Sequence, residues 1–283
     1  MRLRLFLSAL LFGVLASRPV FANCGMDICE SPGHIDSEGK PLSLTTDARF
    51  THVSHDDRYF ETMVGTIYKM NDRFKMGTRI PVVSVQQAGQ NTTGLGNVVV
   101  FGTASLLNAE TNKRLNLGIQ LEVPSVSDEA LGDGHFLILP TVQFGWYPSN
   151  AILSAIVGWG QVLDGNHNHS ESHHSSGHDD HGHGHHEAVQ APSIVNPHAN
   201  TEVLIRTDSG YGWDLSKSRF TTSLRTDIIQ EFGDNTNELL ASAGPVFGLA
   251  WTQITSEIST LFSLTNARRY QHRTTLRLRF QLP

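Results

Sequence analysis

A histidine-rich stretch, residues 166–187, holds the side chains of this chain that are best suited to chemistry. It contains nine of the chain's 15 histidines together with four carboxylates, and it has no Lys, Arg or apolar residue. Neutral imidazole is a common ligand for zinc, copper and nickel, and carboxylates can complete such a coordination shell. Gly177, Gly182 and Gly184 give the backbone the freedom to bring two rings to one ion.

The composition of this stretch predicts weak binding of a divalent transition metal, namely zinc, copper or nickel, without an organic cofactor. Because none of its residues can join a core, we expect it to be a loop. The alternative is a solvated polar loop whose affinity for metal is incidental. The candidate metal ligands are His167, His169, His173, His174, His178, His181, His183, His185, His186, Asp179 and Asp180.

Residues 1–22 have the pattern of a secretory signal peptide. Arg2 and Arg4 precede an apolar run, and residues 20–22 are typical of a cleavage site. The apolar run is too short to cross a membrane as a helix.

The segment that follows, residues 23–42, is expected to be an irregular periplasmic segment. It holds the two cysteines of the chain, Cys24 and Cys29. An oxidising compartment favours a small disulfide loop between them, and the alternative is a metal site built from both thiolates.

The rest of the chain shows alternation of apolar and polar residues rather than helical periodicity. In one stretch, for example, Leu117, Ile119 and Leu121 alternate with Gly118 and Gln120. The net charge of −6 gives no sign of nucleic-acid binding. The alternation predicts twelve strands near residues 43–52, 59–69, 73–86, 95–107, 113–123, 135–147, 151–163, 201–213, 218–230, 239–251, 254–264 and 271–282.

The length of these strands separates a soluble sandwich from a membrane barrel. Sandwich strands usually have about five or six residues, whereas a tilted strand needs about 9–11 residues to cross a bilayer. Aromatic residues near the strand ends suit the interfacial girdle of such a barrel, namely Tyr59, Tyr68, Trp146, Tyr147, Tyr211, Trp213 and Tyr270. We therefore predict an all-β protein, an antiparallel transmembrane β-barrel of about 12 strands over residues 43–283, in contact with the lipid of the bacterial cell outer membrane.

The connections between the predicted strands indicate how the barrel is oriented. Bacterial barrels have short periplasmic turns and longer outer loops. The longer connections here include residues 87–94, 124–134 and the histidine-rich loop, residues 164–200. With both chain ends periplasmic, the histidine-rich loop is the fourth outer loop and faces the cell exterior.

Charged residues on the polar face of the predicted strands are expected inside the barrel. They would line a wet pore or form salt bridges across the lumen. As a set, they disfavour a purely apolar conduit. They are Arg79, Arg114, Glu122, Arg206, Asp208, Arg225, Asp227, Glu257, Arg273, Arg277 and Arg279.

Glycine and proline elements in the chain resemble one known family. These elements are residues 94–98, residues 117–124, residues 132–134 and, late in the chain, residues 243–245. They are similar to elements of the outer-membrane transporters of the "MetA-pathway of phenol degradation" family, although Asn97 stands where the family usually has Asp. The resemblance implies a membrane β-barrel of about this size with a transport role, and it supplies no catalytic residues. The histidine-rich loop is not part of the family pattern.

Three functions are consistent with these features, and an enzyme is not expected. The first is an outer-membrane channel that handles divalent metal through the histidine-rich loop. The second is a surface protein that sequesters metal and has a closed lumen. The third is a channel for small organic, including aromatic, compounds in which the histidine tract is incidental.

Overall fold

The computed structural model describes residues 41–54, 57–87, 89–107, 112–125, 128, 131, 135–163, 201–232, 237–265 and 270–282. These residues form thirteen strands in one antiparallel sheet. The strands are β1 (Leu42–His52), β2 (Arg58–Lys69), β3 (Phe74–Gln87), β4 (Gln90–Leu95), β5 (Val98–Ser105), β6 (Lys113–Val123), β7 (Leu137–Trp146), β8 (Ala151–Val162), β9 (Thr201–Leu215), β10 (Ser218–Phe232), β11 (Asn237–Trp251), β12 (Ile254–Ser263) and β13 (His272–Gln281).

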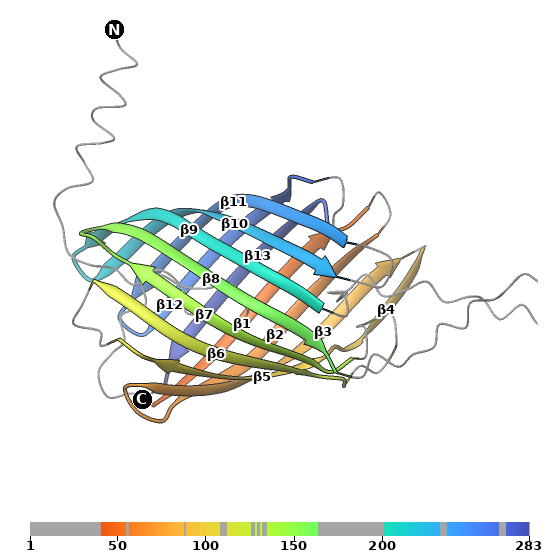
Figure 1. Ribbon diagram of the computed structural model, residues 1–283, viewed down its shortest axis with the longest axis horizontal. Helices are drawn as coiled ribbons and strands as arrows, with labels where there is room; N and C mark the ends of the chain where they lie inside the picture. The colour runs from red at the N-terminus through yellow and green to blue at the C-terminus, as the bar shows by residue number, and fades with distance from the viewer. Residues whose placement is uncertain are drawn as a thin grey trace, which may run out of the picture.

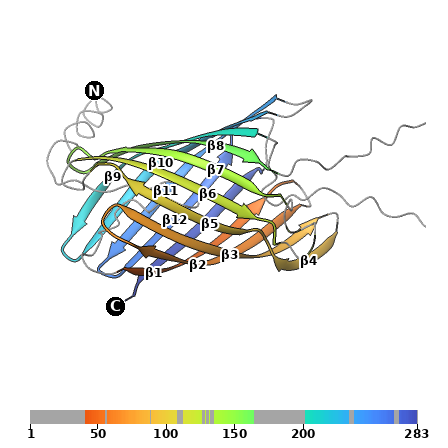
Figure 2. The ribbon, with the colours of Figure 1, turned by 60° about the horizontal axis from the view of Figure 1, so that its bottom comes forward.

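The sheet closes on itself as a barrel, and twelve of the strands form the ring. Each of these strands pairs with its neighbour in the chain, except that β3 pairs with β5, and β1 closes the ring by pairing with β13. Figures 1 and 2 show the strands running obliquely around the barrel. The predicted fold class, an antiparallel β-barrel of about 12 strands, is confirmed.

No helix in the described part of the chain is both long enough and apolar enough to cross a membrane.

The loop predicted over residues 87–94 is instead mostly the remaining strand, β4. The outer half of β3 pairs with β4, and its other half pairs with β5, so β4 and β5 act as one strand that is interrupted at residues 96–97. Gly89 turns the chain between β3 and β4 with a φ of 79°, which glycine adopts without strain. The β4 arm of this hairpin is polar, and its Thr93 hydroxyl donates to the Ser84 hydroxyl of β3 at 2.9 Å. The strand was not predicted because β4 lacks apolar alternation.

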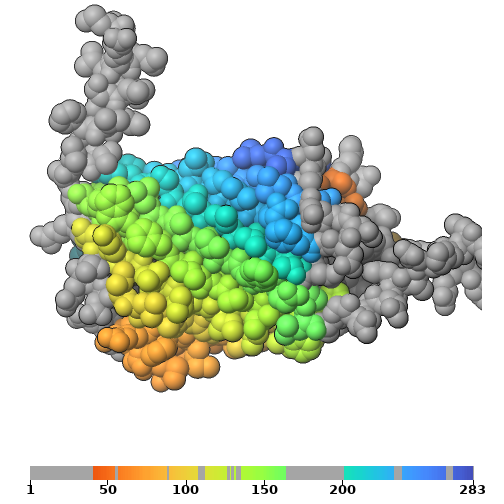
Figure 3. Space-filling model, in the orientation of Figure 1, coloured from red at the N-terminus to blue at the C-terminus, as the bar shows by residue number. Residues whose placement is uncertain are grey.

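Alternation along each strand puts apolar side chains on the outside of the barrel and polar ones inside. On β7, Val142, Phe144 and Trp146 are exposed, whereas Thr141 and Gln143 are buried. The same division recurs around the ring, and Figure 3 shows side chains of neighbouring strands packed side by side over one face of the wall. An apolar exterior of this extent is suited to lipid rather than to water.

Outward-facing aromatic side chains lie near both ends of the wall. At the end where the chain enters and leaves the barrel they are Tyr68, Phe74, Trp146, Trp213 and Trp251, and at the other end they are Phe60, Phe136, Trp159, Phe232 and Phe262. The girdle prediction was wrong for Tyr59, Tyr147 and Tyr270, which are buried inside. The residue type indicated an interface, but the strand register decides which face each ring occupies.

The connections differ in length between the two ends of the barrel. At the end where β1 begins and β13 ends, they are residues 70–73, 106–112, 147–150, 216–217 and 252–253. At the opposite end they are residues 53–57, 88–89, 124–136, 163–200, 233–236 and 264–271. Bacterial barrels have short periplasmic turns, so we call the second end the outer end and the first end the periplasmic end.

Candidate functional site

The lumen wall carries a chain of ion pairs that begins on β9 and β10. The Arg225 guanidinium donates from Nε to Asp208 at 2.8 Å and from Nη1 to Glu257 at 3.1 Å. A second pair, Arg206 with Asp227, lies beside it on the same two strands. Asp208 and Arg225 are opposite each other in the register, as are Arg206 and Asp227, so the two strands present their charges in complementary order.

The ion pairs continue on the other side of β11. Glu257 on β12 is the register partner of Arg277 on β13, and Arg277 in turn is opposite Asp47 on β1. The Arg277 guanidinium donates hydrogen bonds to both carboxylate oxygens of Asp47, at 2.9 and 3.1 Å. Asp47 also lies 3.5 Å from Nη1 of Arg79, which comes from β3.

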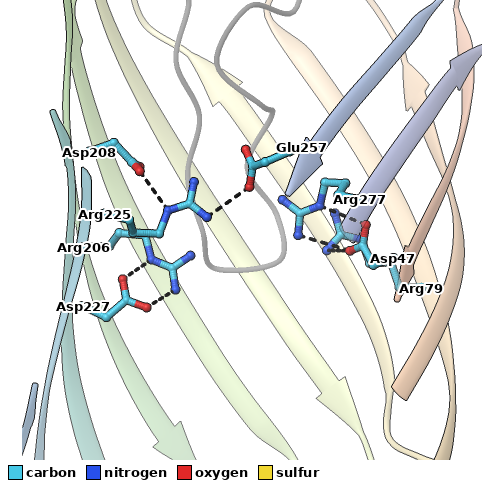
Figure 4. A network of polar contacts seen from close by, with 8 residues as sticks. All are labelled: Asp47, Arg79, Arg206, Asp208, Arg225, Asp227, Glu257 and Arg277. Atoms are coloured by element: carbon cyan, nitrogen blue, oxygen red, sulfur yellow. Dashed lines mark hydrogen bonds and ion pairs between the residues drawn. The ribbon is translucent and has the colours of Figure 1, made fainter. Parts of the chain in front are cut away.

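These eight residues form what we call the charge belt, namely Asp47, Arg79, Arg206, Asp208, Arg225, Asp227, Glu257 and Arg277. Figure 4 shows them reaching across the inner wall in two groups. The belt contains four arginines and four carboxylates, so its charges balance. Its members are buried or nearly so, and a buried charge is tolerated only when it is paired.

Glycines on the intervening strands make room for the long side chains of the belt. On β11, Gly244 and Gly248 are the register partners of Arg225 and Glu257. On β2, a Cβ atom at Gly65 would lie 2.3 Å from the Thr78 carbonyl oxygen and 2.7 Å from Cγ of Arg79. Gly65 therefore leaves room for the stem of Arg79 beside β2, whereas on β11 the buried side chain of Val246 lies between the two glycines.

This geometry predicts that Gly65→Ala weakens the barrel and separates Arg79 from Asp47. The new methyl group meets backbone, which cannot move aside easily, so we expect a loss of about 1–3 kcal/mol in the free energy of unfolding. Gly102→Ala is the matched control, because its Cβ would meet nothing closer than 3.9 Å. Urea unfolding of both variants in detergent checks the prediction, and equal midpoints for the two variants would contradict it.

The wall opposite the belt, on β5 to β8, carries fewer charges, namely Arg114 and Glu122 of β6. Its inward positions include Gln120, Thr141, Gln143 and Ser154. An apolar cluster also lies inside the barrel, where Ile67 on β2 packs with Val99 and Phe101 on β5 and with Ile156 on β8. Because the cluster joins strands from separate parts of the ring, apolar side chains meet across the lumen. The lumen therefore has a strongly charged side and a side that is less charged and partly apolar.

The start of the connection between β6 and β7 is tied to the inner wall. The Ser125 hydroxyl accepts from the Val98 amide at 2.9 Å and donates to the Gly96 carbonyl at 2.8 Å. Leu131, further along, is buried against Tyr59 of β2 and neighbouring residues of β3. The break between β4 and β5 is thus held by the loop that follows β6.

The eleven predicted metal ligands, residues 167–186, all lie outside the described residues. What the structure gives is the position of the two strands that flank them: β8 ends and β9 begins at the outer end of the barrel. Cys24 and Cys29 also lie outside the described residues. Within the part of the chain that is described, no three His, Cys, Asp or Glu side chains are grouped to hold a metal ion.

The prediction that charged residues face the lumen is confirmed for seven belt residues and for Arg114, Glu122, Arg273 and Arg279, whereas the eighth belt residue, Asp47, was not predicted. A pair of histidines on the outside was not predicted either. His52 ends β1 and His272 begins β13, and their rings are stacked with centroids 5.1 Å apart. They are brought together by barrel closure, which joins the first and last strands and leaves no local signal.

Comparisons with known proteins agree with this architecture. No family model matches the sequence, and no curated protein matches it. Among solved structures, an outer-membrane channel from Pseudomonas putida F1 has a TM-score of 0.58 at 10% identity, over 87% of this chain and 99% of that one. The NanC porin has a TM-score of 0.48 at 11% identity over 84% and 100% of the two chains, and the CymD monoaromatic hydrocarbon channel has 0.40 at 8% over 86% and 89%.

The fold and these comparisons define the class of protein. The chain is a bacterial outer-membrane β-barrel, with an apolar exterior and a charged lumen. The architecture that it shares with the P. putida channel agrees, at the level of the fold, with the resemblance seen in its glycine and proline elements.

Proposed function

We propose that this barrel is an outer-membrane channel whose histidine-rich connection binds a divalent transition metal at the outer mouth. The observation that carries the proposal is the position of β8 and β9. These strands flank the histidine-rich stretch, and both reach the outer end of the barrel. Weak binding there raises the local metal concentration while still allowing release, which transport requires.

The inner wall of the barrel carries charged side chains. Fixed charges of both signs face the lumen from β9 around to β3, and a polar wall of this kind suits hydrated or charged solutes better than purely apolar ones. Because the belt is internally balanced, it favours neither sign of charge strongly. We therefore expect the imidazoles and carboxylates of residues 166–187, at the outer mouth, to determine the selectivity for cations.

The orientation of the barrel in the membrane can be tested with an epitope tag. An epitope tag inserted between Ser175 and Ser176 should be tolerated, because that stretch has no apolar residue to anchor it. Antibody should label the tag on intact cells. A tag at Ser216, in the short turn between β9 and β10, is the control and should be labelled only after permeabilisation. The reverse pattern would place the histidine-rich stretch in the periplasm.

Planar-bilayer recordings test the proposal directly. The intact barrel should conduct, and micromolar zinc on the outer side should alter the current through it. A variant that lacks residues 166–187 should conduct without responding to zinc. A barrel that binds metal but never conducts would instead be a metal-sequestering surface protein.

A channel for small organic compounds is the second candidate, and the apolar cluster of Ile67, Val99, Phe101 and Ile156 favours it. The resemblance to the "MetA-pathway of phenol degradation" transporters points the same way. Uptake of a monoaromatic compound into liposomes, compared between the intact protein and Phe101→Gln, distinguishes this candidate. If uptake depends on Phe101 and conductance is indifferent to zinc, the metal proposal fails and this one stands.

A further inference from the structure

Three nitrogen-bearing side chains form a row on the lipid-facing surface at the outer end of the barrel. Arg58 on β2 is the register partner of His52 on β1, and His52 is the register partner of His272 on β13. Their neighbour Thr51 is fully buried inside, so alternation along β1 turns His52 outward. We call these three residues the outer basic row.

Some N–H donors of the outer basic row have no hydrogen-bond partner among the described residues. The Nε of Arg58 donates to Oε1 of Gln86 at 2.8 Å, which fixes the guanidinium while leaving its two terminal nitrogens without a partner among the described residues. The two imidazoles are stacked, with an angle of 25° between the rings, so their edges remain accessible. A held guanidinium beside two ring edges is a preorganised set of N–H donors.

The row lies at the outer margin of the apolar band. Phe50 and Phe60 face each other one step deeper in the membrane and are 39% and 47% exposed. Phe262 lies level with the row, and the rings of Phe50 and Phe262 approach His272 with centroids 6.2 and 6.3 Å away. Aromatic rings at this position contact acyl chains, so the row above them is at the level of the lipid head groups.

The charges around the row indicate an anionic ligand. Two described carboxylates lie close to Arg58 in sequence: Asp57, which accepts from the Ser54 hydroxyl at 2.7 Å, and Glu61, which faces the lumen and pairs with Arg49. The permanent cation Arg58 beside the histidine pair repels a metal ion, and among the described residues no three His, Cys, Asp or Glu side chains are grouped to bind one. A guanidinium with free terminal nitrogens instead matches the geometry of a phosphate group.

We propose that the outer basic row binds the phosphate group of an outer-leaflet glycolipid, the lipid A part of lipopolysaccharide. Arg58 binds two phosphate oxygens, the histidine edges donate to the phosphate, and the acyl chains lie along Phe50, Phe60 and Phe262. The site is independent of the metal and channel functions proposed above, since it is on the opposite surface of the wall.

Binding of lipid A to the full-length barrel in detergent, measured by native mass spectrometry, tests the site. The probes are bisphosphorylated lipid A and lipid A from which the phosphates have been removed. The variants are Arg58→Gln and the double variant His52→Gln/His272→Gln. Lys217→Gln, in an exposed turn at the periplasmic end, is the matched loss of one cation.

The wild type and Lys217→Gln should bind the bisphosphorylated lipid with the same affinity. Arg58→Gln should weaken this binding by about tenfold or more, because a charge-assisted pair of hydrogen bonds is lost. Arg58→Lys should restore part of it. Heat-modifiable migration on gels verifies that each variant is folded.

Three results would overturn the assignment. Equal binding of the phosphorylated and dephosphorylated lipids by the wild type would mean that the acyl chains alone are recognised, and this comparison needs no variant. Unchanged affinity in folded Arg58→Gln would remove the row from the site. Displacement of lipid A by millimolar inorganic phosphate would likewise count against a site built for the glycolipid.

Discussion

Arg225→Met is expected to lower the free energy of unfolding by about 3–5 kcal/mol, because it leaves two buried carboxylates without their shared cation. Asp208 and Glu257 are 1% and 3% exposed, so water cannot replace the lost guanidinium unless the wall opens. Methionine keeps most of the volume of the arginine stem. Urea unfolding in detergent micelles or lipid bilayers measures the loss.

Two further variants separate the loss of charge from loss of packing. The triple variant Arg225→Met, Asp208→Asn and Glu257→Gln should recover most of the stability, since it removes the unpaired charges as well. Arg219→Met is the matched single change, because its partner Asp214 is 55% exposed and can be solvated by water. We expect it to cost less than about 1 kcal/mol. If Arg225→Met were no more costly than Arg219→Met, the belt would not be a structural network.

The second large effect is the release of metal as the pH falls. A ligand imidazole must be neutral, and an unperturbed histidine has a pKa of about 6.5. At pH 5 only about 3% of such a ring is neutral, so a site with two imidazole ligands should lose about a thousandfold in affinity relative to neutral pH. Protonation also makes the nine histidines of residues 166–187 repel one another and the metal.

Calorimetric titration of zinc into the purified barrel at pH 7.5, 6.5 and 5 follows this loss. Affinity should fall progressively with pH and return when the pH is raised again. A binding constant that is the same at pH 7.5 and pH 5 would mean that carboxylates rather than histidines hold the metal.

The sequence predicted the barrel well because a transmembrane strand is specified locally. Alternation with a period of two put Arg79, Asp208, Arg225 and Glu257 on the lumen face, and the structure has each of them there. The alternation does not determine which of these charged side chains form ion pairs with one another. Arg225 pairs with Glu257 across β11, a choice that depends on the register of three strands.

The features that escaped prediction are those fixed by pairing between distant segments. His52 and His272 meet because β1 and β13 close the ring, and Leu131 returns to cover Tyr59 on a strand far earlier in the chain. Inward-facing apolar residues such as Ile156 were also missed, because β8 is apolar on both faces and its polar face was identified from its serine and glycines. The nine histidines were found from composition alone, which identifies their chemistry but assigns them no geometry.

Binding of metal to the proposed site, the histidine-rich connection at the outer mouth, is tested most directly by a calorimetric titration of zinc at pH 7.5. The intact barrel is compared with a variant in which residues 166–187 are replaced by a Gly-Ser linker of equal length, and heat-modifiable migration verifies that both are folded. The intact barrel should bind zinc, and the linker variant should lose most of that binding while keeping its stability. Equal zinc binding by the two proteins would contradict the claim and would move the metal site to Cys24 and Cys29 or to the lumen.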